Sequence, residues 1–418
     1  MMNTNKKTPK LRFKGFTDDW EQRKLNEFLS VSNLKNAENK YNKKDVLSVS
    51  GDYGIVNQID FQGRSFAGAS VSNYGVVEKG DIVYTKSPLK LNPYGIIKTN
   101  RLNNGIVSTL YAIYKTKENC DSKFIEHYFN LDSRLNQYLK PLVNKGAKND
   151  MKVSSENALI GEVCFPKITE QVLIADLLDC LDIYITLHQR KLEKLKLNKS
   201  ALLQKLFPQK GCTIPDVRFK GFTDAWEQRK LNDFGIATGG TSIESEFVDG
   251  GTYKVINIGS YSEESVYNDQ GLRVNKTDKT KSRILNKYDL TMILNDKTAS
   301  GNIIGRVLLI DQDNTYVYNQ RTERIEVDTK NFLPMFLYHM LNAPEQRKYI
   351  VKASQGNTQI YVNWSTISNI DYMIPQLLLE QEKIANLFSL INKDITLHQR
   401  KLDCLISIKK GLLQQLFV

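Results

Sequence analysis

Two long stretches of the chain carry an apolar residue at alternating steps of four and three positions. Residues 169–207 contain no proline or glycine, and residues 379–417 contain only Gly411, close to their end. In each stretch the apolar stripe is interrupted only by one histidine and one lysine. This spacing, kept up along the whole stretch, predicts two long helices that pack along a coiled-coil seam.

The polar interruptions of the stripe indicate the relative direction of the two helices. They are His188 and Lys199 in the first stretch and His398 and Lys409 in the second. A parallel, in-register pair would stack these like residues on each other in a dry seam. An antiparallel pair places each lysine beside an apolar residue, along which its stem can lie while the ammonium group reaches water. We therefore expect an antiparallel pair.

The residues before each long helix show the apolar, β-branched segments and the turn residues that are typical of strands. These segments are 45–50, 75–86, 94–99 and 105–115 in the first half, and 252–259, 288–294, 302–310 and 317–327 in the second. In both halves a helix-like segment follows, at 124–139 and at 336–350. The predicted fold class is α/β (α+β), with two globular modules that are each followed by a long helix.

The two halves of the chain are also partly identical. Residues 9–28 match residues 215–234 at 16 of 20 positions, and residues 185–207 match residues 395–417 at 15 of 23. The segments between them share little. The repeated opening, FKGFTDxWEQRKL, is expected to form a capped short helix or a strand. The repeat predicts four regions, which are a first module at 1–168, a helix at 169–208, a second module at 209–378 and a last helix at 379–418.

The similarity between the two halves leads to a functional expectation. The near-identical segments are expected to perform one role twice, whereas the divergent segments between them are expected to perform two related but different roles. The net charge of +12, with 20 tyrosines and 17 phenylalanines, suits contact with nucleic acid. The sequence has no run of 18 apolar residues, and its five cysteines show no CxxC spacing. We expect a cytoplasmic protein without a disulfide framework or a zinc site.

No residue set in the sequence supports catalysis. The four histidines fall into repeat-related pairs on predicted helices, and no phosphate-binding GxxxxGK[ST] loop occurs. The divergent middles instead offer residues for contact with DNA, since lysine and arginine suit phosphates while asparagine, glutamine and arginine can pair with base edges. The predicted DNA-binding residues are Lys86, Lys90, Lys98, Arg101, Lys145, Lys148, Asn149, Lys152, Lys297, Arg306, Gln320, Arg321, Asn357, Gln359 and Tyr361.

The order of module, long helix, module and long helix resembles the specificity subunits of type I DNA restriction–modification systems. The helices begin with Glu170-Gln171 and Ile174-Ala175, and with Glu380-Gln381 and Ile384-Ala385. The RFKGFTDxWEQRKL openings and the ITLHQRKL helices also look like versions of that family. The resemblance covers essentially the whole chain. It is specific for the full layout and weak for any single motif.

The resemblance implies two target recognition domains, each reading one half of a split, asymmetric sequence in double-stranded DNA. It implies an antiparallel helical spacer that binds two modification (methyltransferase) subunits, with restriction subunits added for cleavage. The chain itself would be non-catalytic and hold no cofactor or metal, while its partners would use S-adenosylmethionine, ATP and Mg²⁺. The family supplies no transferable base-contacting residues, because its recognition domains vary.

Two other readings stay open at this point. One is a stand-alone DNA adenine methyltransferase or nuclease with its own recognition domain, which would need a cofactor motif that the sequence lacks. The other is a coiled-coil adaptor that binds no nucleic acid. Salt-dependent, sequence-selective binding of duplex DNA would exclude the adaptor, and methyl transfer by the chain alone would favour the enzyme.

Overall fold

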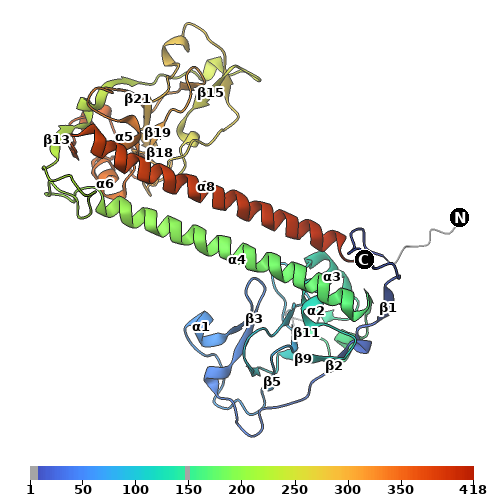
Figure 1. Cartoon of the computed structure of the whole chain (residues 1–418). Coiled ribbons are helices and arrows are strands. Elements are labelled where there is room, and N and C mark those ends of the chain that lie inside the picture. Colours follow the sequence, from blue (N-terminus) through green and yellow to red (C-terminus); the bar gives the residue numbers. More distant parts are fainter. Residues whose placement is uncertain (1–7, 146–150) are drawn as a thin grey trace. The chain divides into compact units, whose positions relative to one another are not determined.

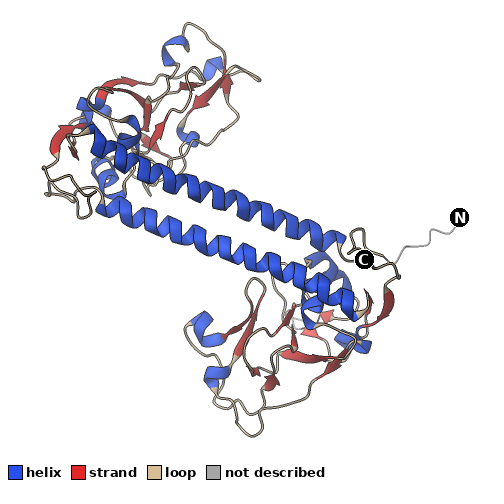
Figure 2. Ribbon diagram, viewed as in Figure 1, coloured by secondary structure: helices blue, strands red, loops and turns tan. Residues whose placement is uncertain are grey.

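The structure is a computed structural model that describes residues 8–145 and 151–418. The chain divides into two compact units, one formed by residues 1–189 with 400–418 and the other by residues 190–399. We call them unit 1 and unit 2. Each contains one globular module and parts of both long helices, as the sequence colours of Figure 1 and the helices of Figure 2 show.

The same four-stranded antiparallel sheet forms the frame of both modules. In unit 1 its order is β2 (Leu29–Val31), β9 (Tyr111–Thr116), β6 (Ile82–Thr85) and β7 (Ile97–Thr99). In unit 2 the order is β14 (Gly235–Gly239), β21 (Thr322–Val327), β17 (Leu290–Ile293) and β19 (Val307–Leu309). Every residue of β6 and of β17 is buried, which fits their mostly apolar sequences.

The repeated openings form strands rather than helices. β1 (Glu21–Lys24) pairs antiparallel with β12 (Glu162–Phe165), and β13 (Glu227–Lys230) pairs in the same way with β23 (Asp371–Ile374). Of the two forms that the sequence left open, the strand is therefore correct. The tryptophan just before each strand, Trp20 or Trp226, is buried in the core of its unit.

The strands beside this frame differ between the modules. Unit 1 has the antiparallel pairs β3 (Leu47–Ser50) with β4 (Gly54–Asn57) and β5 (Gly75–Val77) with β8 (Gly105–Val107). Unit 2 has a mixed sheet in which β15 (Tyr253–Ile256) lies between β16 (Arg273–Val274) and β20 (Tyr316–Tyr318). Short pairs complete the modules, β10 (Asn144–Lys145) with β11 (Met151–Lys152) and β18 (Asn295–Asp296) with β22 (Ile360–Tyr361).

Each helix-like segment is split into two helices. Unit 1 has α2 (Ser122–Phe129) and α3 (Asp132–Leu139), and unit 2 has α5 (Pro334–Leu341) and α6 (Pro344–Ala353). The break in unit 2 comes from Pro344, which fits the first turn of a new helix but cannot continue the old one. The short helices α1 (Gln58–Gln62) and α7 (Trp364–Ile367) lie in the loops.

The predicted long helices are present as α4 (Ile168–Lys205) and α8 (Leu378–Gln415). All stripe positions of both helices, the histidines and lysines included, are buried or half-buried. Within unit 1, Leu416 of the α8 end shares a core with Ile174 of the α4 start, while Lys409 contacts Asp182 further along. The two helices therefore run in opposite directions there, as predicted.

The Glu-Gln start of each long helix connects the helix to the opening of its module. Arg12 donates two hydrogen bonds to Glu170, at 2.8 and 2.9 Å, and Arg218 does the same to Glu380, at 2.7 and 2.9 Å. The following glutamine in each helix is fully buried and bonds to backbone groups of its module. Neither long helix, nor any other helix among the described residues, combines the length and apolarity needed to cross a bilayer.

Candidate nucleic-acid interface

Unit 2 has a polar hollow of about 460 Å³ on its divergent part. Its walls come from the turns after β15, β17 and β20, from the segment around Glu244 and from the loop before β22. They bring together residues more than 100 positions apart in the sequence, namely Glu244, Phe247, Asn257, Ile258, Asn295, Lys297, Asn319, Gln320, Arg321 and Gln359. We call it the unit 2 pocket. Four of the predicted DNA-binding residues line it: Lys297, Gln320, Arg321 and Gln359.

The polar groups of this pocket differ in how far the fold uses them. Asn319 is buried, and its Oδ1 accepts a hydrogen bond from the Ile243 amide at 3.1 Å. Gln320 donates to Glu244 at 3.2 Å. Lys297 and Arg321 are exposed, and within residues 8–145 and 151–418 neither forms an ion pair with an acidic side chain. These two cations are therefore available to a ligand that carries negative charge or acceptor oxygens.

Arg321 has a left-handed backbone conformation, with φ of 66°. Its carbonyl accepts a hydrogen bond of 2.8 Å from the Leu294 amide, which ties the β20–β21 turn to the end of β17. A non-glycine residue is rarely found with such a φ, and strain of this kind is concentrated at functional sites. The conformation holds the arginine at the rim of the unit 2 pocket.

The short pair β18–β22 carries further predicted residues to the same place. Asn295 is paired with Tyr361, so the loop 355–361 lies against the pocket wall that holds Lys297. Tyr361 is exposed, and Asn357 is exposed in the same loop. The loop turns at Gly356, which has φ of 106° and where an added Cβ would lie only 2.1 Å from the Gln359 carbonyl oxygen. Only glycine fits this turn.

Arg306 is not part of the unit 2 pocket. Its guanidinium donates to the Asn302 carbonyl at 2.9 Å and to Ser265 at 3.2 Å, and burial lowers its pKa. In unit 1, Lys98 donates to Asn130 at 2.7 Å, and burial likewise lowers its pKa. Arg101 pairs with Glu126 at 2.9 Å and with Asp179 at 2.7 Å. The structure thus gives these three predicted residues protein partners.

The other predicted residues of unit 1 lie in a loop, in a pair of short strands or outside the described residues. Lys86 follows β6 directly, and Lys90 is exposed at the tip of the next loop. Lys145 and Lys152 belong to the paired strands β10 and β11. Lys148 and Asn149 lie outside the described residues.

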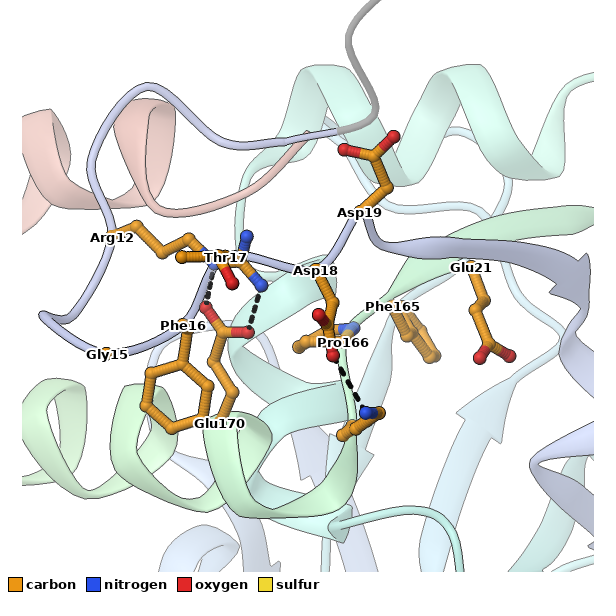
Figure 3. Close-up of a pocket in the computed structure, with 11 residues that line it drawn as sticks. Arg12, Gly15, Phe16, Thr17, Asp18, Asp19, Glu21, Phe165, Pro166 and Glu170 are labelled. Carbon is orange, nitrogen blue, oxygen red and sulfur yellow. Dashed lines mark hydrogen bonds and ion pairs between the residues drawn. The ribbon is translucent and has the colours of Figure 1, made fainter.

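A second hollow, also of about 460 Å³, lies in unit 1 at the repeated opening (Figure 3). Its charged groups mostly satisfy one another, since Arg12 is paired with Glu170 and Asp18 with Lys167 at 2.8 Å. Several residues of its rim, such as Gly15, Thr17 and Asp18, are exposed and identical in the second opening. With its acidic lining, this hollow does not suit the phosphates of DNA.

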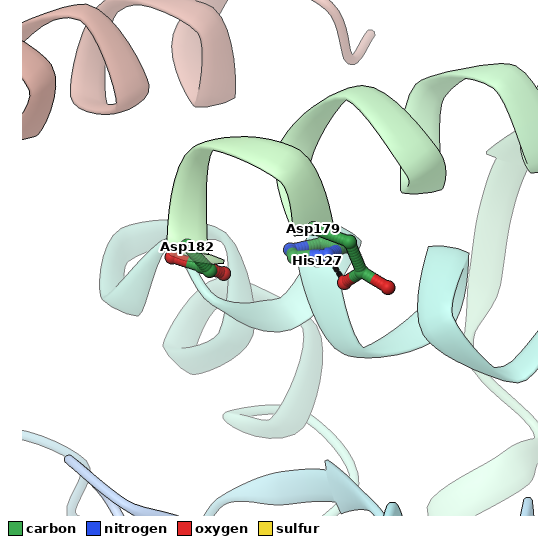
Figure 4. Close-up of side chains that lie close together, drawn as sticks. All are labelled: His127, Asp179 and Asp182. Carbon is green, nitrogen blue, oxygen red and sulfur yellow. Dashed lines mark hydrogen bonds and ion pairs between the residues drawn. The ribbon is translucent and has the colours of Figure 1, made fainter. Parts of the chain in front are cut away.

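One cluster in unit 1 has the composition of a metal site, with ligand atoms of His127, Asp179 and Asp182 within 4.8 Å of one another (Figure 4). Its carboxylates already have cationic partners, because Asp179 contacts Arg101 and Lys123 while Asp182 contacts Lys409. Burial would raise the pKa of Asp179, but hydrogen bonds from His127 and Arg101 outweigh burial and hold it below the ordinary value. The cluster is better described as an ion-pair network than as a metal site.

Comparison with known proteins relates this architecture to one family. Residues 223–405 match the type I restriction modification DNA specificity domain. The chain is 25% identical over 265 residues to the type I restriction enzyme MjaVIII specificity subunit of Methanocaldococcus jannaschii, a match that spans 61% of each protein. The solved S subunit of a type I restriction-modification system from M. genitalium has the same fold, with a TM-score of 0.59, 13% identity and coverage of 98% of this chain and 99% of that chain.

Residues 223–405 thus carry the DNA specificity domain of type I restriction–modification systems, and the chain is similar to their specificity subunits. This confirms the family that the sequence resembles. The family model covers the second half, and the repeated openings and helices extend the likeness to the first. The matched segment, described as a DNA specificity domain, contains all residues that line the unit 2 pocket.

Sequence reasoning missed several residues of the unit 2 pocket. They are Asn257, Asn295, Asn319 and the aromatic Phe247. Asn319 directly precedes Gln320 and could have been included on the same chemistry. The others come from turns far away in the sequence, and no local pattern marks them as neighbours.

Proposed function

We propose that the chain reads a bipartite, asymmetric DNA sequence, with one half-site per module, and serves as the non-catalytic scaffold of a restriction–modification complex. The proposed domains are those that the repeat predicts, at 1–168, 169–208, 209–378 and 379–418. Two modification subunits would bind the duplicated parts, because parts that are present twice suit two equivalent partners. Restriction subunits would join this complex for cleavage. S-adenosylmethionine, ATP and Mg²⁺ would be held by these partners.

The unit 2 pocket is the observation that carries this proposal. Lys297 and Arg321 are exposed cations, and Gln359, Gln320 and Asn295 are amides beside them. Lysine can neutralise a phosphate, while arginine and glutamine can pair bidentately with guanine and adenine in the major groove. The pocket lies on the part that differs between the modules, which suits two different half-sites.

The test replaces two pocket residues in the complex of the full chain with its modification subunits. Arg321→Gly removes the guanidinium but keeps the left-handed backbone, which glycine adopts without strain. Gln359→Ala removes the amide. We expect each to relax specificity at one base position of one half-site, with about 1–3 kcal/mol of discrimination lost. The other half-site should be unchanged when methylated bases are mapped.

Asn314→Gly is the matched control, because Asn314 is also exposed and has φ of 52° but lies outside the pocket. It should leave the recognised sequence unchanged. If Arg321→Gly and Gln359→Ala both retain the wild-type sequence, the reading surface is not this pocket. If the wild-type complex binds duplex DNA without sequence preference, the proposed function itself is wrong.

A further inference from the structure

The two modules carry different side chains at equivalent places of their frame. In unit 2 the Leu294 amide donates to the Arg321 carbonyl at 2.8 Å, and in unit 1 the Lys86 amide donates to the Leu110 carbonyl at 3.1 Å. The strand registers agree with this, since Ile293 is opposite Thr322 and Thr85 is opposite Tyr111. Leu110 therefore occupies in unit 1 the position that Arg321 has in unit 2.

The equivalence extends along the turn that precedes β9 or β21 and along the turn that follows β6 or β17. Counting back from Leu110, the segment Ser108-Thr109-Leu110 replaces Asn319-Gln320-Arg321. Counting on from the ends of β6 and β17, Leu89 replaces Lys297. The amide and cationic side chains of the unit 2 module are thus replaced by hydroxyl side chains and leucines in the unit 1 module.

These leucines are exposed and contribute little to the core. Leu110 is 61% exposed, and Leu91, in the same loop as Leu89, is 70% exposed. Lys86 and Lys90 stand in that loop as well, so Leu89 and Leu91 have cations as near neighbours in the sequence. Exposed leucines beside cations suit a surface that lies on the DNA backbone and inserts apolar groups into a groove.

Leucine cannot form hydrogen bonds with base edges. In the major groove the apolar group that a base presents is the 5-methyl of thymine. We propose that the first module reads its half-site largely by contact of Leu110 and Leu89 with thymine methyl groups, whereas the second module reads by hydrogen bonds. This inference rests on the proposed function and names the chemistry of recognition in each half-site.

The test uses duplexes in which thymines are replaced by deoxyuridine, which pairs identically but lacks the methyl group. The half-site that Arg321→Gly leaves unchanged is assigned to the first module. There, uracil should weaken binding of the complex of the full chain with its modification subunits by about fourfold for each contacted methyl. In the other half-site the same replacement should change affinity by less than about twofold, since no methyl is contacted.

A variant connects the effect to the leucine. Leu110→Ala should bind thymine and uracil duplexes equally, and Leu110→Met should restore the preference because methionine reaches the same volume. Leu102→Ala is the matched control. Leu102 is 41% exposed but follows β7, which ends beside the start of β6 and therefore at the opposite end of the strands. It should keep the full preference for thymine.

Each outcome decides the inference. A half-site of the first module without thymine, or one in which uracil binds as well as thymine, overturns it. So does a Leu110→Ala complex that still prefers thymine, because the methyl would then touch another residue. These results would leave sequence-selective binding intact, whereas loss of all sequence preference in the wild type would show that the proposed function had failed.

Discussion

His127 and His339 occupy equivalent positions in the two units, yet their surroundings are opposite. Nε2 of His127 lies 2.8 Å from Asp179, which also contacts Arg101 and Lys123. The residue equivalent to Asp179 is Ser389, and the ring of His339 packs against Phe388 with centroids 5.2 Å apart. Burial lowers the pKa of His339 to about 3, so it is neutral. One frame thus accepts either an ion-pair network or an apolar contact between module and helix.

Some contacts between module and helix are the same in both repeats, and others differ. The Arg–Glu pairs and the buried glutamines are the same in both units, because they connect each module to its helix. The contacts around the histidines have diverged, because each neighbourhood needs only to satisfy its own polar groups. The surfaces proposed to read DNA have diverged furthest. Three experiments test this difference between the units.

The largest effect is expected where the units are alike. Glu170→Ala and Glu380→Ala should each destabilise their own unit by about 3 kcal/mol, because removing the buried glutamate leaves a half-buried arginine without its partner. Glu380→Ala should have the slightly larger effect, since Glu380 also accepts a hydrogen bond from Trp226 Nε1 at 3.3 Å. Hydrogen exchange followed by segment would measure each unit separately. Asp18→Asn, in an exposed pair with Lys167, should change little.

An intermediate effect is expected where the units differ. Asp179→Ala leaves Arg101 and His127 without their shared carboxylate and should destabilise unit 1 by about 2 kcal/mol. Ser389→Ala, at the equivalent position, removes a hydroxyl that contacts the Ala385 carbonyl and the Met335 sulfur, and should cost unit 2 less than about 1 kcal/mol. Hydrogen exchange of the two units would give both values. Equal losses would contradict the view that only unit 1 depends on charge here.

The smallest effect concerns pH in unit 2. His339 is neutral when folded, so the unfolded chain binds more protons below its ordinary pKa of 6.5, and stability is lost as pH falls. Glu323 has the opposite effect. Burial raises its pKa to about 7, so its contribution to the stability of unit 2 is lost as pH rises. Between pH 7 and 5.5 each of these two groups changes the free energy of unfolding of unit 2 by about 1 kcal/mol, and the two changes nearly cancel.

Variants separate these two contributions. His339→Gln should make unit 2 more stable at pH 5.5 than at pH 7, and Glu323→Gln should make it less stable, when hydrogen exchange is corrected for its intrinsic pH dependence. The wild type should change little. A wild type and two variants with the same pH dependence would show that neither group titrates differently in the folded state.

The long helices, their relative direction and the repetition of the module could be predicted from the amino-acid sequence alone. Apolar periodicity is local, so a stripe of leucines and isoleucines predicts a helix and its buried side without knowledge of any partner. The lysines at stripe positions indicated an antiparallel pair, although the sequence did not reveal that Asp182 would receive Lys409. The identical openings indicated two equal modules before any contact was known.

Which polar residues remain available to a ligand became clear only from the folded structure. Lys98, Arg101 and Arg306 look like Lys297 and Arg321 in the sequence, yet the first three have protein partners and the last two line a pocket. Ion pairs and burial depend on residues far away along the chain, such as Asp179 for Arg101. The pocket itself joins turns that no local pattern connects, because the strands that carry them become neighbours only when the sheet forms.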